Sequence, residues 1–285
     1  MNNKITVVLI SHKSNELIFK FINNFSKDIK ILIIENSSDR QLQKKIKKYK
    51  NINIKYMKNN GYGAAINYAR KHILTKYFFV FSPDVKKVDD NLIYKFEKKI
   101  KIIKNFGALG PRFINVKEKS HKQSNRSLEV GEIDSISGSA MCFDTKSFDK
   151  IGGFDENIFL YFEETDYCMR ARKMGYKMYQ LNRLVVEHPR GAANGVVKVK
   201  NRNEISNLEK LYFWHFVWSK YYIYNKHYGR LFTFIYFVPS FIRIFFRIIL
   251  YSCQKNICMK EKYQARLNGL LSSMKGFKSF KRLLN

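Results

Sequence analysis

The sequence predicts an α/β protein whose core is a mostly parallel sheet flanked by helices. Short apolar runs alternate with longer helix-like stretches through residues 1–110, and this alternation is typical of β-α-β units. The runs are continuously apolar, as expected for strands that are buried on both faces. Hydrophobic residues make up 45% of the 285-residue chain, with only 14 Gly and 4 Pro, which excludes disordered and collagen-like proteins.

The predicted strands and helices alternate in order along residues 1–110. The strands are Ile5–Ile10, Lys30–Ile34, Ile52–Met57 and Tyr77–Phe81, and the helices are Asn15–Ser26, Arg40–Tyr49 and Ala64–Thr75. Ligands of parallel sheets bind beyond the carboxyl ends of the strands. We therefore expect site residues directly after each strand.

Residues 111–204 predict a less regular second half of the same domain. The predicted elements are a strand at Ser137–Phe143, a helix at Glu163–Met174, and strands at Tyr176–Gln180 and Leu184–Glu187. Gly175 is a suitable residue to end the helix.

Residues 205–285 predict a basic, amphipathic helical region. Its most apolar part, Leu231–Ser252, is interrupted by Pro239, Arg243 and Arg247. A spanning helix needs about 20 apolar residues with few charges, so the pattern favours a helix that lies in the plane of a membrane surface. The aromatic residues of this region suit an anionic membrane, but packing on the first domain explains them equally well.

The charge and the cysteines narrow the function less than the motifs do. The formal net charge is +30, from 53 Lys and Arg against 23 Asp and Glu. This charge favours an anionic partner, whether nucleic acid, membrane or phosphorylated substrate, yet a general composition bias accounts for it as well. The four cysteines form no CxxC pair, which indicates reduced thiols in a cytosolic protein. The short apolar run at the N-terminus does not predict a signal peptide.

Seven motifs occur in a fixed order. They are VVLISHKS (7–14), IIENSS (33–38), NNGYGAAINYA (59–69), FSPDV (81–85), SGSAMCFDTKSFDKIGGFDE (137–156), FLYFEETDYCMRARKMGYK (159–177) and VEHPRG (186–191). Their order and spacing resemble the family 2 inverting glycosyltransferases, which have the GT-A fold, and in particular the rhamnosyltransferase-like branch that builds bacterial surface polysaccharides. The resemblance covers roughly the first two-thirds of the chain and continues weakly through SKYYIYNKHYG (219–229).

This resemblance implies a domain organisation and a reaction. Residues 1–204 would be a GT-A catalytic domain, with a nucleotide-sugar half at about 1–110 and an acceptor half at about 111–204. Residues 205–285 would associate with the membrane. The donor would be a nucleoside diphosphate sugar, with dTDP-L-rhamnose as the sugar to expect, and the acceptor a lipid-linked or growing surface glycan. The protein would work in the cytoplasm, peripherally at the inner face of the plasma membrane.

Polar residues after the first three strands are the candidate donor site. A uracil or thymine ring offers an N3–H donor, so an acceptor is needed near the end of the second strand, and Glu35 and Asn36 are the candidates. The family usually has Asp-Asn or Asp-Asp here, so Glu35 is one carbon longer; an Asx-type turn made by Asn36 is the alternative. The complete donor set that we expect is Ser11, His12, Glu35, Asn36, Asn59, Gly61, Asn67 and Asp84.

Glycines after the third strand suit a diphosphate. Gly61 and Gly63 allow close backbone approach, and the following helix N-terminus favours a phosphate. Asn67 matches an Asn of the family motif, although a solvent-facing helix position would explain it as well.

Asp84 is the expected metal ligand. The family has a DxD motif where this chain reads Ser82-Pro83-Asp84, so one carboxylate is left. One carboxylate is sufficient for Mg²⁺ or Mn²⁺ when substrate phosphates and water complete the shell, although an Asp that caps a turn would look the same. His188 resembles the distant His that completes the metal site in this fold; taken alone, a single His is more often structural.

Glu163, Glu164 and Asp166 form the expected catalytic cluster. An inverting transfer needs one base to take the proton of the acceptor hydroxyl. The family motif is ED-x-D with its second acid as the base, and Glu164 occupies that place. Because Glu is longer than Asp, Glu163 or Asp166 could substitute. Acids at a helix N-terminus also favour the helix dipole, and neighbouring negative charges would raise the pKa of the base.

The acceptor side is expected at four residues that match flanking motifs. These are Gly138, Ser139, Gly153 and Asp155, where small side chains leave room for a sugar. Arg170 falls where the family has an Arg and would orient the acids or a phosphate, unless it makes only a surface salt bridge.

Two other functions are compatible with parts of the sequence. A basic, aromatic RNA-binding module would explain the C-terminal region, but no RNA-binding signature is present and the acidic cluster would be unexplained. A nucleotidyltransferase of similar fold shares the phosphate and metal chemistry, but SHKSNE (11–16) lacks the Gly-rich, basic signature expected near the first strand. We therefore expect no nucleic-acid partner.

Overall fold

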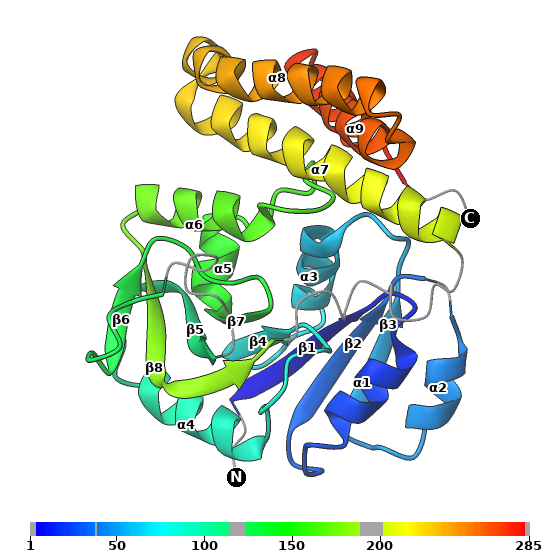
Figure 1. Ribbon diagram of the computed structural model, residues 1–285. Helices are drawn as coiled ribbons and strands as arrows, with labels where there is room; N and C mark the ends of the chain where they lie inside the picture. Colours follow the sequence, from blue (N-terminus) through cyan, green and yellow to red (C-terminus); the bar gives the residue numbers. More distant parts are fainter. Residues whose placement is uncertain (1–3, 38, 115–122, 189–201, 283–285) are drawn as a thin grey trace. The chain divides into compact units, whose positions relative to one another are not determined.

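The computed structural model describes residues 4–37, 39–114, 123–188 and 202–282 (Figure 1). The chain divides into two units. The first unit consists of Met1–Phe154 and Glu164–Val197, and the second of Asp155–Glu163 and Lys198–Asn285. The short segment Asp155–Glu163 therefore belongs with the C-terminal residues, which a division at a single point of the sequence does not anticipate.

The strands and helices of the described residues up to 188 are β1 (Ile5–Ser11), α1 (Asn15–Ile22), β2 (Lys30–Glu35), α2 (Gln41–Ile46), β3 (Ile52–Tyr56), α3 (Tyr62–Arg70), β4 (Tyr77–Phe81), α4 (Asp90–Ile100), β5 (Phe106–Ile114), β6 (Val130–Ile133), β7 (Ala140–Asp144), α5 (Thr145–Ile151), α6 (Glu163–Lys173) and β8 (Lys177–Glu187). Strands and helices alternate as far as β5, after which β6 and β7 follow as strands and α5 and α6 as helices.

The strands form one mixed sheet in the order β3-β2-β1-β4-β7-β5-β8-β6. β1 pairs in parallel with both β2 and β4, and β2 pairs in parallel with β3. β7 runs antiparallel to β4 and β5, and β6 runs antiparallel to β8. The chain winds outward from β1 to β3 and then returns to β4, so the order reverses beside β1. Ligands of open α/β sheets bind at such a switch point. The mostly parallel sheet with its helices confirms the predicted α/β fold class.

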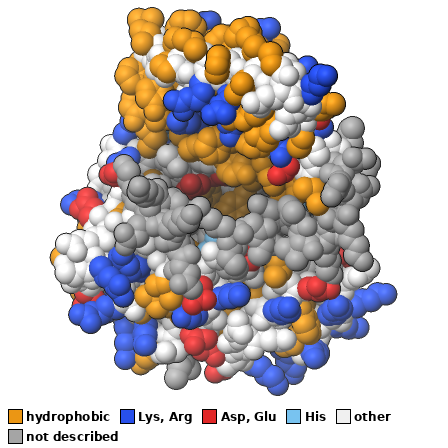
Figure 2. All heavy atoms as spheres, in the orientation of Figure 1, with side chains coloured by type: hydrophobic (Ala, Val, Ile, Leu, Met, Phe, Trp, Pro, Cys, Tyr) orange, Lys and Arg blue, Asp and Glu red, His pale blue; other side chains and the backbone are white. Residues whose placement is uncertain are grey.

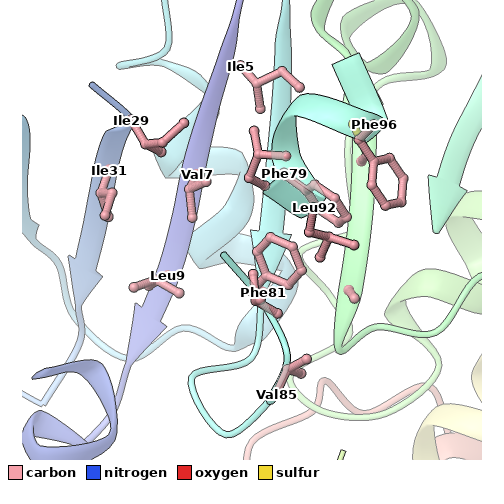
Figure 3. Close-up of a cluster of buried hydrophobic side chains, with 14 of the residues drawn as sticks. Ile5, Val7, Leu9, Ile29, Ile31, Phe79, Phe81, Val85, Leu92 and Phe96 are labelled. Atoms are coloured by element: carbon pink, nitrogen blue, oxygen red, sulfur yellow. The ribbon is translucent and has the colours of Figure 1, made fainter. Parts of the chain in front are cut away.

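Helices cover both faces of the sheet. On one face, α1, α2 and α4 pack over β1, β2 and β4. Figure 3 shows Val7 and Leu9 of β1 and Phe79 and Phe81 of β4 in this layer, with Leu92 of α4 close by. On the other face, α3, α5 and α6 pack over the alternate residues of the same strands. Burial on both faces is the reason that these strands are continuously apolar.

Some elements differ from the prediction. β5 and β6 were not expected, because Gly107, Gly110 and Pro111 interrupt the apolar pattern of β5 and because β6 is only 4 residues long. The two strands expected at 176–180 and 184–187 are one strand, β8, whose pairing with β5 shifts register at Pro111. The predicted helices are also too long at their C-terminal ends, as α1 ends at Ile22.

The described residues of the second unit form three long helices, α7 (Arg202–Tyr228), α8 (Arg230–Cys253) and α9 (Ile257–Met274). Trp214 and Trp218 of α7 are buried in a cluster with Ala265 of α9. A Cβ on Gly269 of α9 would lie 2.4 Å from the Trp214 carbonyl oxygen, so this position needs glycine. The tryptophans of the C-terminal region thus pack within their own unit, and the predicted helical region is confirmed.

Candidate functional site

The carboxyl ends of β1, β2 and β3 bring four of the expected donor residues together. The His12 imidazole Nδ1 lies 2.8 Å from Asn36 Oδ1. The Asn36 amide donates to Asn59 Oδ1 at 3.5 Å, and the Gly61 N–H donates to the same oxygen at 3.3 Å. Ser11 ends β1 and is fully buried. Parallel pairing of the three strands causes this convergence, because it aligns their ends at one edge of the sheet.

Glu35 is fully buried at the end of β2. Its Oε1 accepts hydrogen bonds from the Ser37 N–H at 2.6 Å and from the Ser37 hydroxyl at 2.5 Å. Its Oε2 is buried and has no hydrogen-bond partner among the described residues. An unsatisfied buried carboxylate oxygen is costly, and it offers the acceptor that a base N–H would need.

Asp84, Ser139 and His188 meet at the end of β4. Asp84 Oδ1 accepts a hydrogen bond from the Ser82 hydroxyl at 2.6 Å, and Oδ2 lies 3.3 Å from His188 Nε2. Ser139 Oγ lies 3.3 Å from the same imidazole nitrogen. Burial raises the pKa of the Asp84 carboxyl, but the hydrogen bonds and the charge of His188 outweigh it, so the pKa lies below its ordinary value. Asp84 is therefore an anion at neutral pH.

The Asp84–His188 pair offers two side chains of the kind that bind a divalent metal. The described residues contain no group of three or more His, Cys, Asp and Glu side chains arranged to hold a metal. Carboxylate oxygen and imidazole nitrogen are suitable donors for Mn²⁺, and Mg²⁺ commonly binds through one or two carboxylates plus substrate phosphates. The residues present fit a metal that arrives with a diphosphate.

Glu164, the expected catalytic base, lies beside Gly138. A Cβ placed on Gly138 would lie 3.6 Å from Glu164 Oε2, so the glycine leaves the carboxylate clear on that side. The Tyr62 hydroxyl donates to the Gly138 carbonyl at 2.8 Å and fixes that turn. Burial raises the pKa of Glu164; the cause is burial, and not the neighbouring acids that the sequence suggested. The role of Tyr62 was not expected, although its place between two glycines of the NNGYG motif was a signal.

Asp166 and Arg170 connect α6 to the turn after α5. Asp166 is fully buried and lies 2.8 Å from the Arg170 guanidinium. Arg170 also donates to the carbonyls of Ile151 at 2.7 Å and Gly153 at 2.5 Å. The pair fixes the position of α6, which carries Glu164, so Arg170 makes more than a surface salt bridge.

Asn67 packs closely against Gly153 and bonds to the backbone of Phe154 in the first unit. The Asn67 amide donates to the Phe154 carbonyl at 2.9 Å, and its Oδ1 accepts from the Phe154 N–H at 2.8 Å. Gly153 has φ +62°, and a Cβ there would lie 2.6 Å from Asn67 Oδ1. The Asn67 amide is thus bonded to the Phe154 backbone, and its position is not that of a solvent-facing helix residue. The assignment of Asn67 to the donor pocket stays a prediction.

The expected acid and acceptor residues are divided between the units. Gly138, Ser139 and Gly153 belong to the first unit, whereas Asp155 and Glu163 belong to the second. Asp155 Oδ2 accepts hydrogen bonds from the Tyr222 hydroxyl at 2.9 Å and from the Lys226 ammonium at 2.6 Å. Burial raises the pKa of Asp155, but Lys226 and Asn157 outweigh it and hold the pKa below its ordinary value. These bonds anchor Asp155 within the helical unit.

A mixed sheet flanked by helices on both faces and followed by a C-terminal helical region matches the Rossmann-like architecture of GT-A glycosyltransferases. The family model described as Glycosyl transferase family 2 matches residues 6–173. The chain belongs to glycosyltransferase family 2, and its GT-A fold is thereby confirmed.

Similar proteins agree with this family. The low-salt glycan biosynthesis hexosyltransferase Agl10 of Haloferax volcanii is 23% identical over 200 residues, which cover 61% of this chain and 63% of that protein. The mannosyltransferase PcManGT of Pyrobaculum calidifontis, solved with GDP-Man and Mn²⁺, matches with a TM-score of 0.59 at 11% identity and covers 95% of this chain and 87% of its own. TarS of S. aureus, solved with UDP-GlcNAc, matches with a TM-score of 0.54 at 14% identity, covering 96% and 92%.

Proposed function

We propose that this protein is an inverting glycosyltransferase that moves a sugar from a nucleoside diphosphate sugar to a lipid-linked or growing surface glycan. The observation that carries the proposal is Glu164, a half-buried acid with a raised pKa that lies beside Gly138 within the family-matched region.

Glu164 acts as the base in this proposal. Its carboxylate takes the proton of the acceptor hydroxyl while that oxygen forms a bond to the anomeric carbon. The bond from the anomeric carbon to the diphosphate breaks on the opposite face, and the diphosphate leaves with the electron pair. A raised pKa makes the carboxylate a stronger base near working pH, and Asp166 with Arg170 positions the helix that carries it.

The donor nucleotide binds at the ends of β1–β3. Glu35 Oε2, which lacks a partner among the described residues, accepts the N–H of the base, and Asn36 and Asn59 line the same edge. The two structural neighbours contain UDP-GlcNAc and GDP-Man, which supports a nucleotide-sugar donor. The motif resemblance to the rhamnosyltransferase-like branch favours dTDP-L-rhamnose.

A divalent metal would be held by Asp84 and His188. When bound, Mg²⁺ or Mn²⁺ neutralises charge on the departing diphosphate. Ser82 and Ser139 hold the two side chains in place through hydrogen-bond contacts at 2.6 and 3.3 Å. The presence of Mn²⁺ in the mannosyltransferase structure supports this assignment.

Helix α8 supports attachment to a membrane surface. It is long and apolar enough to cross a bilayer, with a mean hydropathy of 1.7, and it is the one helix of this kind among the described residues. Phe237 and Ile244 face the interior of the unit, whereas Ile235, Ile242 and Phe246 are about 60% exposed. Figure 2 shows hydrophobic side chains gathered over α8.

The two arginines favour a helix that lies in the membrane plane. Arg243 and Arg247 are both exposed, and side chains four residues apart lie on the same side of a helix. One cationic flank beside one apolar side is typical of interfacial helices, whereas a spanning helix would place both charges in hydrocarbon. With all four cysteines free, we assign the protein to the cytoplasmic side.

A donor-hydrolysis panel tests the proposed function. The protein is incubated with dTDP-, UDP- and GDP-sugars, with and without Mg²⁺ or Mn²⁺, and release of the nucleoside diphosphate is measured. We expect hydrolysis of one nucleotide class that needs the metal. If calorimetry detects no sugar-nucleotide binding and the protein binds RNA tightly without sequence preference, the RNA-binding alternative is correct.

A further inference from the structure

Four aromatic residues of the second unit form a cluster that the proposed chemistry does not use. We call it the aromatic patch, and it consists of Tyr161, Phe162, Tyr212 and Phe216. Tyr161 packs edge-on against Tyr212 and Phe216, with ring centroids 6.2 and 5.7 Å apart, and the Phe162 and Phe216 centroids are 5.1 Å apart. Phe216 is 43% exposed, and the other three are half-buried. The patch therefore presents ring surface to its surroundings.

The backbone of the patch is held in a strained conformation. Tyr161 and Phe162 have φ +69° and +68°, a region that residues with a Cβ rarely adopt. Two such residues in a row persist only where the surrounding structure imposes them, and they concentrate at functional sites.

Contacts from α7 and the C-terminal residues hold the segment directly before this pair. The Ser219 hydroxyl donates to the Leu160 carbonyl at 2.8 Å. The Arg282 guanidinium lies 3.6 Å from the centroid of the Phe159 ring, and the His215 ring is 4.9 Å from the same centroid. The segment before the patch is thus fixed from three sides within the same unit.

The chemistry of the patch suits a neutral sugar ring. One face of many pyranose rings carries only C–H groups, which pack against the face of an aromatic ring, while the hydroxyls around its edge need hydrogen-bond partners. Burial raises the pKa of Tyr161 to about 12 and also raises the pKa of Tyr212, so both hydroxyls keep their protons and can donate. Aromatic walls with a few polar groups are typical of small-molecule sites.

The position of the patch in the chain connects it with the acceptor. Phe162 precedes the proposed base Glu164 by two residues, and Tyr161 follows the Gly153–Asp155 turn that the motifs assign to the acceptor side. We propose that the aromatic patch binds the neutral pyranose ring of the acceptor, with Phe216 as the stacking ring and Tyr161 and Tyr212 as hydroxyl donors. This inference rests on the proposed function, since it names the group that the same enzyme glycosylates.

Saturation-transfer NMR tests the inference without requiring turnover. The full chain is mixed with methyl pyranosides of glucose, galactose, mannose, rhamnose and N-acetylglucosamine, and their affinities are measured. Phe216→Leu keeps an apolar side chain but removes the ring, and Phe216→Tyr keeps the ring. We expect affinity for the bound glycoside to fall about tenfold in F216L, as the loss of one aromatic contact implies, and to stay near wild type in F216Y.

The control is Phe277→Leu, the same change at a ring that is 56% exposed elsewhere in the unit. It should leave glycoside binding unchanged. The inference is overturned if no methyl pyranoside binds the wild type, if F216L binds as well as the wild type, or if F216L loses vesicle partition and keeps glycoside binding. Failure of the proposed function would look different, because the wild type would then neither bind nor hydrolyse any sugar nucleotide.

Discussion

Glu35, Asp84 and Glu164 of the candidate site all carry a carboxyl group, but the surroundings of the three carboxyl groups differ. Glu35 is fully buried with one oxygen bonded to Ser37 and the other without a partner among the described residues. Asp84 has its pKa lowered by His188 and Ser82 against the effect of burial. Glu164 has its pKa raised by burial. These differences match three roles, namely acceptor for a base N–H, metal ligand and proton acceptor.

The raised pKa of Glu164 predicts the acid side of the pH profile. The base works as a carboxylate, so kcat is present above its pKa and is lost as the pH falls through it. Because the pKa is raised, the fall in kcat should begin at a higher pH than an ordinary glutamate, with a pKa of about 4.3, would give. A pH–kcat profile of the wild type measures this. A profile that stays flat down to the ordinary glutamate range would contradict burial as the cause of a tuned base.

Replacement of Asn67 should lower the free energy of unfolding. Asn67→Ala removes both hydrogen bonds to the Phe154 backbone, and we expect the free energy of unfolding to fall by roughly 1–3 kcal/mol because a buried partner is left unsatisfied. Urea denaturation measures this, and Asn91→Ala, at an exposed position of α4, is the matched control. Donor affinity of the same variant tests the donor-pocket assignment, which fails if the affinity is unchanged.

At the scale of the elements, the sequence predicts strands that have a clear hydrophobic pattern. It misses strands that form only because of tertiary packing. β4 is predicted with its observed ends, because Tyr77–Phe81 is apolar on both faces. β5 is missed because tertiary packing, and not its local pattern, makes a strand of a segment with Gly107, Gly110 and Pro111.

The candidate site shows the same division. The family resemblance anticipates the meeting of Asp84 with His188, which lie 3.3 Å apart. The hydrogen bonds of Asn67 join it to Phe154, which lies 87 positions away in the chain. No local sequence pattern predicts which distant residue Asn67 contacts.

The structure also changes how helix α8 should be tested. Deleting residues 231–285 would remove α9 as well, and α9 buries Trp214 through the close approach at Gly269. Such a truncation would expose the core of the second unit. Substitution on the exposed side of α8 avoids this problem.

Replacing two exposed apolar residues of α8 should release the protein from membranes. Ile242→Gln with Phe246→Gln changes side chains that are 60% and 62% exposed. Because each buried apolar side chain of this size contributes about 1.5–3 kcal/mol, we expect sedimentation with phosphatidylglycerol-containing vesicles to fall more than about tenfold. Leu74→Gln with Ile102→Gln, at two exposed positions of the first unit, is the control. Equal partition of both double variants would rule out α8 as the attachment element.

At the scale of the whole molecule, the positive charge is unevenly distributed. Residues 198–285 contain 17 Lys and Arg against 3 acidic residues, and this part carries the exposed apolar helix α8. Basic residues near an anionic membrane contribute about 1 kcal/mol each, and salt screens their attraction. The basic residues of 198–285 therefore lie in the part of the chain for which we propose contact with an anionic membrane.

Membrane partition should consequently depend on salt and on lipid charge. We expect binding to vesicles with phosphatidylglycerol to weaken as NaCl rises from about 0.1 M to about 1 M, where the screening length falls from about 10 Å to about 3 Å. Binding to pure phosphatidylcholine vesicles should be weak throughout. Partition that is equal for both lipids and insensitive to salt would show that the charge plays no part.

The assignment of Glu164 as the base is the central claim, and one variant tests it most directly. Glu164→Gln keeps the size of the side chain but cannot take a proton, so transfer to the acceptor should fall by at least about 100-fold. Donor affinity, measured by calorimetry on the same preparation, should stay at the wild-type value, because the proposed donor residues lie at the ends of β1–β4. Wild-type turnover in this variant would show that Glu164 is not the base.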